Sequence, residues 1–104
     1  MIKYTIQITQ PAENDLRKIG IYISEELLEL GTARKVVAKI GEAISTLEEL
    51  PMRNALLKDD RLALAGILGI LVDNYIVFYI VTQKNKTVTI IRILYNRRDF
   101  MNLL

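Results

Sequence analysis

The stretch LALAGILGILVDNYIVFYIVTQKNKTVTIIRILY, residues 62–95, decides the fold that this sequence predicts. It holds three apolar runs rich in the strand-forming residues Ile, Val and Tyr, at roughly 64–72, 75–83 and 87–95. Short polar segments of the kind found in tight turns separate them, Asp73-Asn74 and Lys84-Asn85-Lys86. The pattern predicts an antiparallel three-stranded meander. Because the middle run is apolar on both faces, we expect helices on one face and leave the other available to a partner.

The first two runs together approach the length of a membrane span, so a transmembrane helix is the alternative to weigh. Asp73 and Asn74 interrupt the apolar sequence where a bilayer would penalise them, and each half alone is too short to cross. Two buried strands joined by a turn therefore fit better than a membrane helix.

Upstream of the meander, the segment IKYTIQI, residues 2–8, predicts a first strand. Its apolar side chains alternate and share one face, namely Ile2, Tyr4, Ile6 and Ile8. Thr9 and Gln10 are capping residues, Pro11 suits a first helical turn, and Glu13 and Asp15 complement the positive end of a helix. A helix is therefore expected to begin here.

Two helices are predicted between this strand and the meander. An apolar stripe with helical spacing runs from Ala12 to Leu30, and Gly31 is expected to end the first helix. Thr32 is expected to cap a second helix that stops after Leu50, before Pro51. The prediction is a single α+β domain over 1–104, of order β-α-α-β-β-β, with a helical hairpin packed on one face of a twisted antiparallel sheet.

Composition excludes several kinds of chemistry. The 104 residues include no cysteine and no histidine, which removes thiol catalysis, disulfides, thiolate metal sites and the commonest general base. We expect no metal and no cofactor, so any chemistry rests on Arg, Lys, Tyr, Asp or Glu. The first ten residues lack the apolar core of a signal peptide, and a cytoplasmic location without membrane association is expected.

Charge is distributed unevenly along the chain. Residues 1–50 hold six basic and eight acidic side chains, whereas residues 51–104 hold eight and four. From 84 to 98 there are five basic residues and no acid, namely Lys84, Lys86, Arg92, Arg97 and Arg98. This field favours an anionic partner near the C-terminal end.

These basic residues, together with Tyr75 and Tyr79, are the candidate binding residues for a target or an inhibitory partner. Each also has a structural interpretation. The tyrosines share a strand face with Val77 and Val81 and could be core residues with hydroxyls at the rim. Arg92 alternates with Ile90 and Leu94 and could form a structural salt bridge, and the Arg97–Arg98 pair could be a solvated tail. Asp15, Asp59 and Asp60 are interpreted as cap and loop residues.

Several segments resemble the RelE/ParE superfamily of toxins from type II toxin–antitoxin pairs. They are AENDLRKIGIYI at 12–23, AISTLEELPMR at 43–53, DDRLALAG at 59–66, VDNYIVFYIV at 72–81 and VTIIRILYNRRDF at 88–100. The resemblance covers nearly the whole chain. It implies growth inhibition, a link to plasmid stabilisation, and a cognate antitoxin that wraps a segment around the toxin.

The resemblance leaves the target and the enzymatic status open. ParE-like members inhibit DNA gyrase, and RelE-like members cleave mRNA on the ribosome. For a nuclease the catalytic candidates are Arg92, Arg97, Arg98 and Tyr95, with the arginines stabilising the phosphate and the tyrosine moving protons.

Departures from the nuclease pattern favour gyrase inhibition. Ile76 stands where nucleases commonly place an arginine, and the tail DFMNLL lacks their terminal tyrosine or histidine. Leu68 and Gly69 also replace an expected arginine and its polar neighbour, which allows a third alternative, an inactive or detoxified module that only binds antitoxin.

Overall fold

The structure is a computed structural model of the chain and describes residues 3–49, 51–52, 59–97 and 100–104. The elements are β1 (Thr5–Ile8), α1 (Gln10–Ile21), the π-helical turn η1 (Tyr22–Glu26), α2 (Leu30–Thr46), α3 (Asp60–Leu64), β2 (Leu68–Val72), β3 (Tyr75–Thr82), β4 (Thr87–Tyr95) and the 3-10 turn η2 (Phe100–Leu103). The predicted α+β class and order are confirmed. The short helix α3 was not predicted and occupies part of the run assigned to the second strand.

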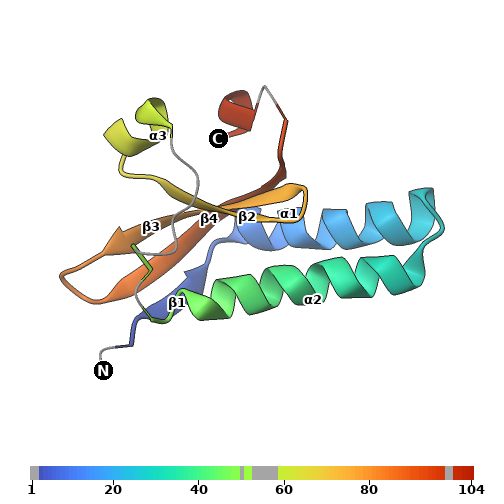
Figure 1. Ribbon diagram of the computed structural model, residues 1–104, viewed down its shortest axis with the longest axis horizontal. Coiled ribbons are helices and arrows are strands. Elements are labelled where there is room, and N and C mark those ends of the chain that lie inside the picture. The colour runs from blue at the N-terminus through green and yellow to red at the C-terminus, as the bar shows by residue number, and fades with distance from the viewer. Residues whose placement is uncertain (1–2, 50, 53–58, 98–99) are drawn as a thin grey trace.

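The four strands form one open sheet in the order β1-β4-β3-β2. The predicted meander is confirmed, since β2 pairs antiparallel with β3 and β3 pairs antiparallel with β4. However, β1 pairs with β4 in parallel, so the sheet is mixed where an antiparallel sheet was expected. The helical hairpin returns the chain to the end of the sheet where β1 began, and β2 and β4 therefore run in the direction of β1 (Figure 1).

The start of α1 agrees with its sequence signals. The Thr9 hydroxyl accepts from the Ala12 N–H at 3.3 Å, Pro11 lies in the first turn, and Glu13 is the acidic residue of that turn. Asp15 lies beyond the first turn and is buried, so its assignment as a cap residue was wrong. Asp59 does cap a helix, because its side chain accepts from the Arg61 and Leu62 N–H groups at the start of α3.

The end of the first helix was predicted too late. The helix widens into the π-helical turn η1 and stops at Glu26. Leu28 takes a left-handed φ of 54°, and Gly31 lies inside α2. Glu29 occupies the cap position of α2 without a side-chain hydrogen bond, so Thr32 is not the cap. The apolar stripe misled the prediction because it continues at helical spacing across the turn. The second helix was also predicted too long, since α2 ends at Thr46 and residues 47–49 form a turn, whereas the predicted stop at Leu50 lies outside the described residues.

The helices cover one face of the sheet and build the larger core. Its buried side chains come from α1, α2 and all three meander strands, and include Ala12, Ile40, Ile44, Val77, Tyr79 and Ile90. Tyr4 and Ile6 of the predicted first-strand face pack against this core, whereas Ile8 is 44% exposed and Ile2 lies outside the described residues.

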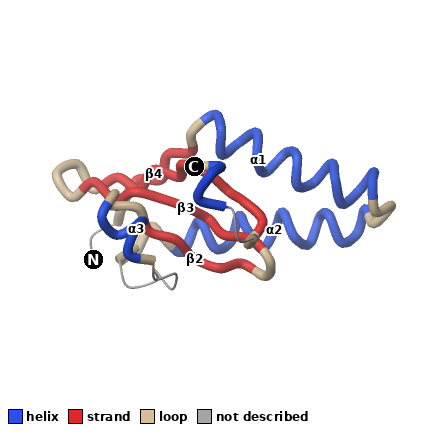
Figure 2. The backbone as a smooth tube through the Cα atoms, turned by 90° about the horizontal axis from the view of Figure 1, so that it is seen from above, coloured by secondary structure: helices blue, strands red, loops and turns tan. Residues whose placement is uncertain are grey.

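The second face of the sheet is covered by the chain itself, contrary to our expectation that it would be left to a partner. Ile76 and Phe78 of β3 are fully buried there beneath Leu62 of α3 and Phe100 of η2. The Phe78 and Phe100 rings meet edge to face with centroids 5.4 Å apart. Figure 2 shows α3 and the C-terminal turn lying over the strands on this side.

A bulge in β4 determines which of its side chains face the helices. The register with β3 shifts between Phe78 and Tyr79, so that Phe78 lies opposite Arg92 while Tyr79 lies opposite Ile90. The expected simple alternation of Ile90, Arg92 and Leu94 is therefore wrong. Ile90 belongs to the helix-side core and Leu94 to the second-face cluster, because the inserted residue reverses the faces beyond it.

Candidate functional site

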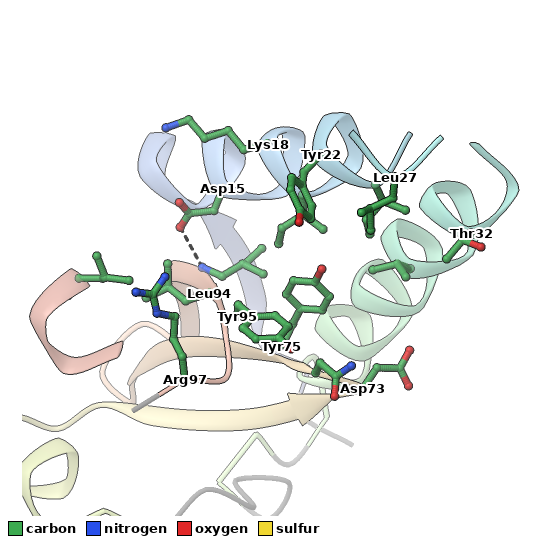
Figure 3. A pocket seen from close by; sticks show the side chains of 16 residues that line it. Asp15, Lys18, Tyr22, Leu27, Thr32, Asp73, Tyr75, Leu94, Tyr95 and Arg97 are labelled. Carbon is green, nitrogen blue, oxygen red and sulfur yellow. Dashed lines mark hydrogen bonds between the residues drawn. The ribbon is translucent and has the colours of Figure 1, made fainter. Parts of the chain in front are cut away.

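A wide concave surface lies where the helical hairpin passes the end of the sheet. It is a groove of about 1120 Å³ between α1, the start of α2, the β2–β3 turn and the end of β4. Figure 3 shows Tyr22, Tyr75 and Tyr95 facing one another in it, while the Lys18 side chain extends outward from α1. We call this surface the tyrosine groove, after Tyr22, Tyr75 and Tyr95, which line it.

The tyrosines come together because of strand register and helix spacing. Tyr75 opens β3 directly opposite Tyr95 at the end of β4, and their rings meet edge to face with centroids 5.6 Å apart. Tyr22 approaches from η1, and about half of its surface and of that of Tyr95 is exposed. Burial raises the pKa of Tyr75, and the neighbouring Tyr95 and Tyr22 add to this. Its hydroxyl is therefore a hydrogen-bond donor at neutral pH and not a base.

Asp15 forms the polar base of the groove. Its carboxylate accepts from Arg92 Nε at 2.7 Å, from Arg92 Nη2 at 2.9 Å and from the Ile93 N–H at 3.0 Å. The Ile93 N–H is available because β1 is only four residues long and ends opposite Ile90, which leaves the edge of β4 unpaired beyond that point. Asp15 therefore satisfies a sheet edge and a half-buried cation together.

Arg92 is committed to this structural network. Besides the two bonds to Asp15, its Nη1 donates to the Leu103 carbonyl at 2.5 Å. The hydrogen bonds that Arg92 donates to Asp15 raise the pKa of Arg92. One guanidinium thus joins α1, β4 and the C-terminal turn, and the structural salt bridge that the sequence allowed for Arg92 is present.

The charged rim of the groove contains residues from both ends of the sequence. Lys18 from α1 and Arg97 beyond β4 line it, and both are exposed. At the other end Asp73 is bonded to Lys39 Nζ at 3.3 Å in an exposed ion pair. The groove therefore offers aromatic and apolar walls with basic groups on one side, which suits a protein segment with apolar and acidic side chains.

The remaining predicted site residues lie elsewhere. Tyr79 is fully buried in the helix-side core, where its hydroxyl donates to the Pro51 carbonyl at 2.6 Å and burial raises its pKa to about 12. Lys84 and Lys86 belong to the β3–β4 turn, at the opposite end of the sheet from the groove (Figure 1). Lys86 lies over the Tyr4 ring, 5.5 Å from its centroid. Arg98 lies outside the described residues.

Three residues of the groove were missed as functional candidates. Asp15, Lys18 and Tyr22 are spaced by three and four, so they share one face of α1. This spacing was available in the sequence. The sequence-based candidates came from the basic C-terminal region and the meander strands, and the helix that faces them was interpreted only as a packing element.

Two further positions bear on chemistry. Ile76, at the position where nucleases commonly carry an arginine, is fully buried in the second-face cluster. Leu68 is half-buried and packs against the helix-side core opposite Tyr79. The described part of the chain contains no cluster of acidic side chains that could hold a metal ion, and no helix in it is long and apolar enough to cross a membrane.

Comparison with known proteins shows which family and which solved structures this chain resembles. The family model described as ParE toxin of type II toxin–antitoxin systems, parDE, matches residues 6–100. No curated protein matches the chain.

Solved structures of similar fold include the following three. A chain of the chromosomal ParDE system from P. aeruginosa superposes with a TM-score of 0.76 at 19% identity, covering 93% of this chain and 100% of that one. A chain of the RelBE2 complex from Mycobacterium tuberculosis gives 0.67 at 23% identity, covering 90% and 99%. A chain of the archaeal RelE–RelB complex from Pyrococcus horikoshii gives 0.63 at 16% identity, covering 92% and 98%.

Proposed function

Because the chain belongs to the ParE toxin family of type II toxin–antitoxin systems, we propose that it arrests growth by inhibiting DNA gyrase and is neutralised by a cognate antitoxin. The tyrosine groove is the proposed docking site for the antitoxin segment. Its apolar and aromatic walls suit the apolar side of such a segment, and Lys18 and Arg97 on its rim suit acidic residues.

The observation that carries the choice of target is the position of Arg92. A nuclease without histidine needs several basic groups free to contact the scissile phosphate. Here the Arg92 guanidinium has three bonds within the fold, two to Asp15 and one to the Leu103 carbonyl. The burial of Ile76 weakens the nuclease alternative further, since that position contributes a core side chain. These features favour inhibition by binding over RNA cleavage.

The test is to assay the purified chain on both targets in parallel. We expect it to reduce supercoiling by gyrase and to increase gyrase-linked DNA cleavage, and to leave mRNA intact on translating ribosomes. Adding the antitoxin should restore supercoiling.

Cleavage of mRNA at ribosomes without an effect on gyrase would establish the RelE-like alternative instead. Antitoxin binding without an effect on either target would establish the inactive binding module. In that module Leu68 would mark the lost charge, although in the structure it already serves as a packing residue.

A further inference from the structure

The tip of the helical hairpin exposes large apolar side chains away from the tyrosine groove. Figures 1 and 2 show the hairpin extending past the end of the sheet, so that its turn projects from the body of the domain. There Leu28 is 82% exposed, Leu30 56% and Ile21 47%. None of these three lines the groove. Exposed apolar side chains gathered in one short turn indicate an interaction surface.

A shallow hollow lies beside these side chains. It has a volume of about 400 Å³ and is lined by Leu30, by small residues that include Gly20, Ser24 and Ala33, and by Arg34. The two helices pack closely at this point, since a Cβ on Gly20 would lie 3.4 Å from Val37 Cγ2. The small side chains thus leave room for an apolar group from outside. We define the tip surface as Ile21, Leu28, Leu30 and this hollow.

The backbone holds the exposed leucine in place at a conformational cost. Leu28 has a φ of 54°, which is unfavourable for a residue with a side chain. The Glu29 N–H donates to the Ile23 carbonyl at 3.0 Å and closes the turn behind it. Glycine would relieve the strain, but the nearest glycine in the chain is Gly31, three residues later. The fold therefore maintains a strained and exposed leucine that contributes little to the core.

Acidic side chains around the tip favour a positively charged partner. Glu25, Glu26 and Glu29 lie in or beside the turn, and no lysine or arginine occurs between Lys18 and Arg34. Within the described part of the chain, none of the three glutamates forms an ion pair. Arg34 lines the hollow, but the three glutamates outnumber it. Anionic lipid and nucleic acid would therefore be repelled here, whereas a cationic protein segment would be attracted.

We propose that the tip surface is a second docking surface, which binds a protein segment presenting apolar side chains beside two or more lysines or arginines. Such a segment would place its apolar side chains against Leu28, Leu30 and the hollow while its basic groups pair with the glutamates. This surface is separate from the tyrosine groove, so the proposal stands or fails independently of gyrase inhibition.

The experiment titrates two helical peptides into the isotope-labelled full-length chain and follows the backbone amides by NMR. One peptide carries leucines on one face and lysines on the other, and the second has glutamates in place of the lysines. We expect the lysine peptide to shift, in a salt-dependent manner, the amides of residues that do not line the tyrosine groove, namely Gly20, Ile21, Leu28, Leu30 and Ala33. The glutamate peptide should bind at least tenfold more weakly.

Three variants separate the contributions. Leu28→Ser with Leu30→Ser should lower the affinity of the chain for the lysine peptide at least tenfold. Leu64→Ser, which changes a leucine that is 91% exposed on α3, should leave this affinity unchanged. Replacing Glu25, Glu26 and Glu29 by glutamine should remove most of the salt dependence. Because all these side chains are exposed, the fold should persist, and thermal unfolding of each variant checks it.

Several outcomes would overturn the proposal. They are shifts confined to the tyrosine groove, equal binding of both peptides, no shift at the tip, or self-association of the chain that the paired serine variant abolishes, since that would make a second copy the occupant.

Discussion

Asp15 is the residue on which the helix, the sheet edge and the C-terminal turn depend. Its carboxylate compensates a guanidinium and a backbone N–H at once, and it is only 8% exposed. Arg92 in turn holds the Leu103 carbonyl. Loss of either Asp15 or Arg92 would leave the charge of the other poorly solvated. The free-energy cost of that unpaired charge exceeds the net stabilisation that the ion pair provides.

We therefore predict that Asp15→Asn lowers the free energy of unfolding by about 2–3 kcal/mol, below the upper range for fully buried pairs because Arg92 is partly exposed. Urea denaturation measures the change. The matched control is Lys39→Ala, which breaks the exposed pair with Asp73 and should cost under about 1 kcal/mol. Equal and small effects in both variants would mean that the buried network does not stabilise the fold.

Tyr79 makes stability depend on alkaline pH. Burial raises its pKa from the ordinary value near 10 to about 12, so the folded state favours the protonated phenol. Its contribution is complete below about pH 10 and is lost as the pH rises toward 12. We expect the free energy of unfolding of the parent chain to fall over this range.

The control for this pH dependence is Tyr79→Phe, which cannot ionise. It should start about 1–2 kcal/mol less stable, because the buried Pro51 carbonyl loses its donor. Its stability should then decline less steeply above pH 10, and denaturation at several pH values compares the two slopes. If the free energy of unfolding fell with pH at the same slope in both proteins, groups other than Tyr79 would cause the loss of stability at alkaline pH. Tyr75, whose pKa is also raised, is one such group.

At the residue scale, the sequence predicted whether a side chain is buried better than it predicted which residue that side chain contacts. The alternative that placed Tyr75 and Tyr79 on a core face agrees with the structure, because alternation along a strand is a local property. The partner of Arg92 is 77 positions away along the chain. It could not be found from local periodicity, because the β4 bulge redirects the side chains and the short β1 leaves the edge that Asp15 satisfies.

At the scale of elements, apolar alternation located β1, capping residues located the start of α1, and apolar runs between turn residues located the three meander strands. Two features were not predicted. The direction of β1 depends on where the hairpin returns the chain, which no local signal encodes. The helix α3 is one and a half turns long and too short for periodicity to reveal, although its cap Asp59 was visible.

The hairpin turn gives a prediction at this scale. The left-handed φ of Leu28 costs about 1 kcal/mol for a residue with a Cβ, whereas glycine adopts it freely. Leu28→Gly should therefore be about 0.5–1 kcal/mol more stable than Leu28→Ala in chemical denaturation, since both remove the same exposed side chain. An alanine variant as stable as the glycine variant would show that the turn relaxes without strain.

For the whole molecule, the distribution of charge and apolar surface matters more than any single element. The second face of the sheet, which the sequence left open for a partner, is closed by α3 and η2. The open concave surface lies instead beside the hairpin, with Lys18 and Arg97 on its rim. The sequence indicated that a basic C-terminal region would meet a partner, but the opposing wall from α1 required the tertiary fold.

Antitoxin binding should raise the stability of the folded chain by mass action. At a free antitoxin concentration a hundredfold above its Kd, the gain is about 2.7 kcal/mol, or roughly 10 °C or more in the thermal midpoint of a domain of this size. Arg97 and Arg98 are predicted to serve this interface, or the target, more than the fold. Arg97 is exposed, and exposed arginines contribute under about 1 kcal/mol to stability.

Replacing both Arg97 and Arg98 by alanine should accordingly leave the midpoint of the free chain nearly unchanged. The same variant should abolish growth arrest, or reduce the stabilisation by antitoxin most strongly at low salt, where charge pairs contribute most. Lys84→Ala with Lys86→Ala is the matched control, because it removes two positive charges at the opposite end of the sheet and should preserve both properties. If the arginine variant unfolds yet keeps its activity per folded molecule, these arginines anchor the C-terminal segment and do not bind a partner.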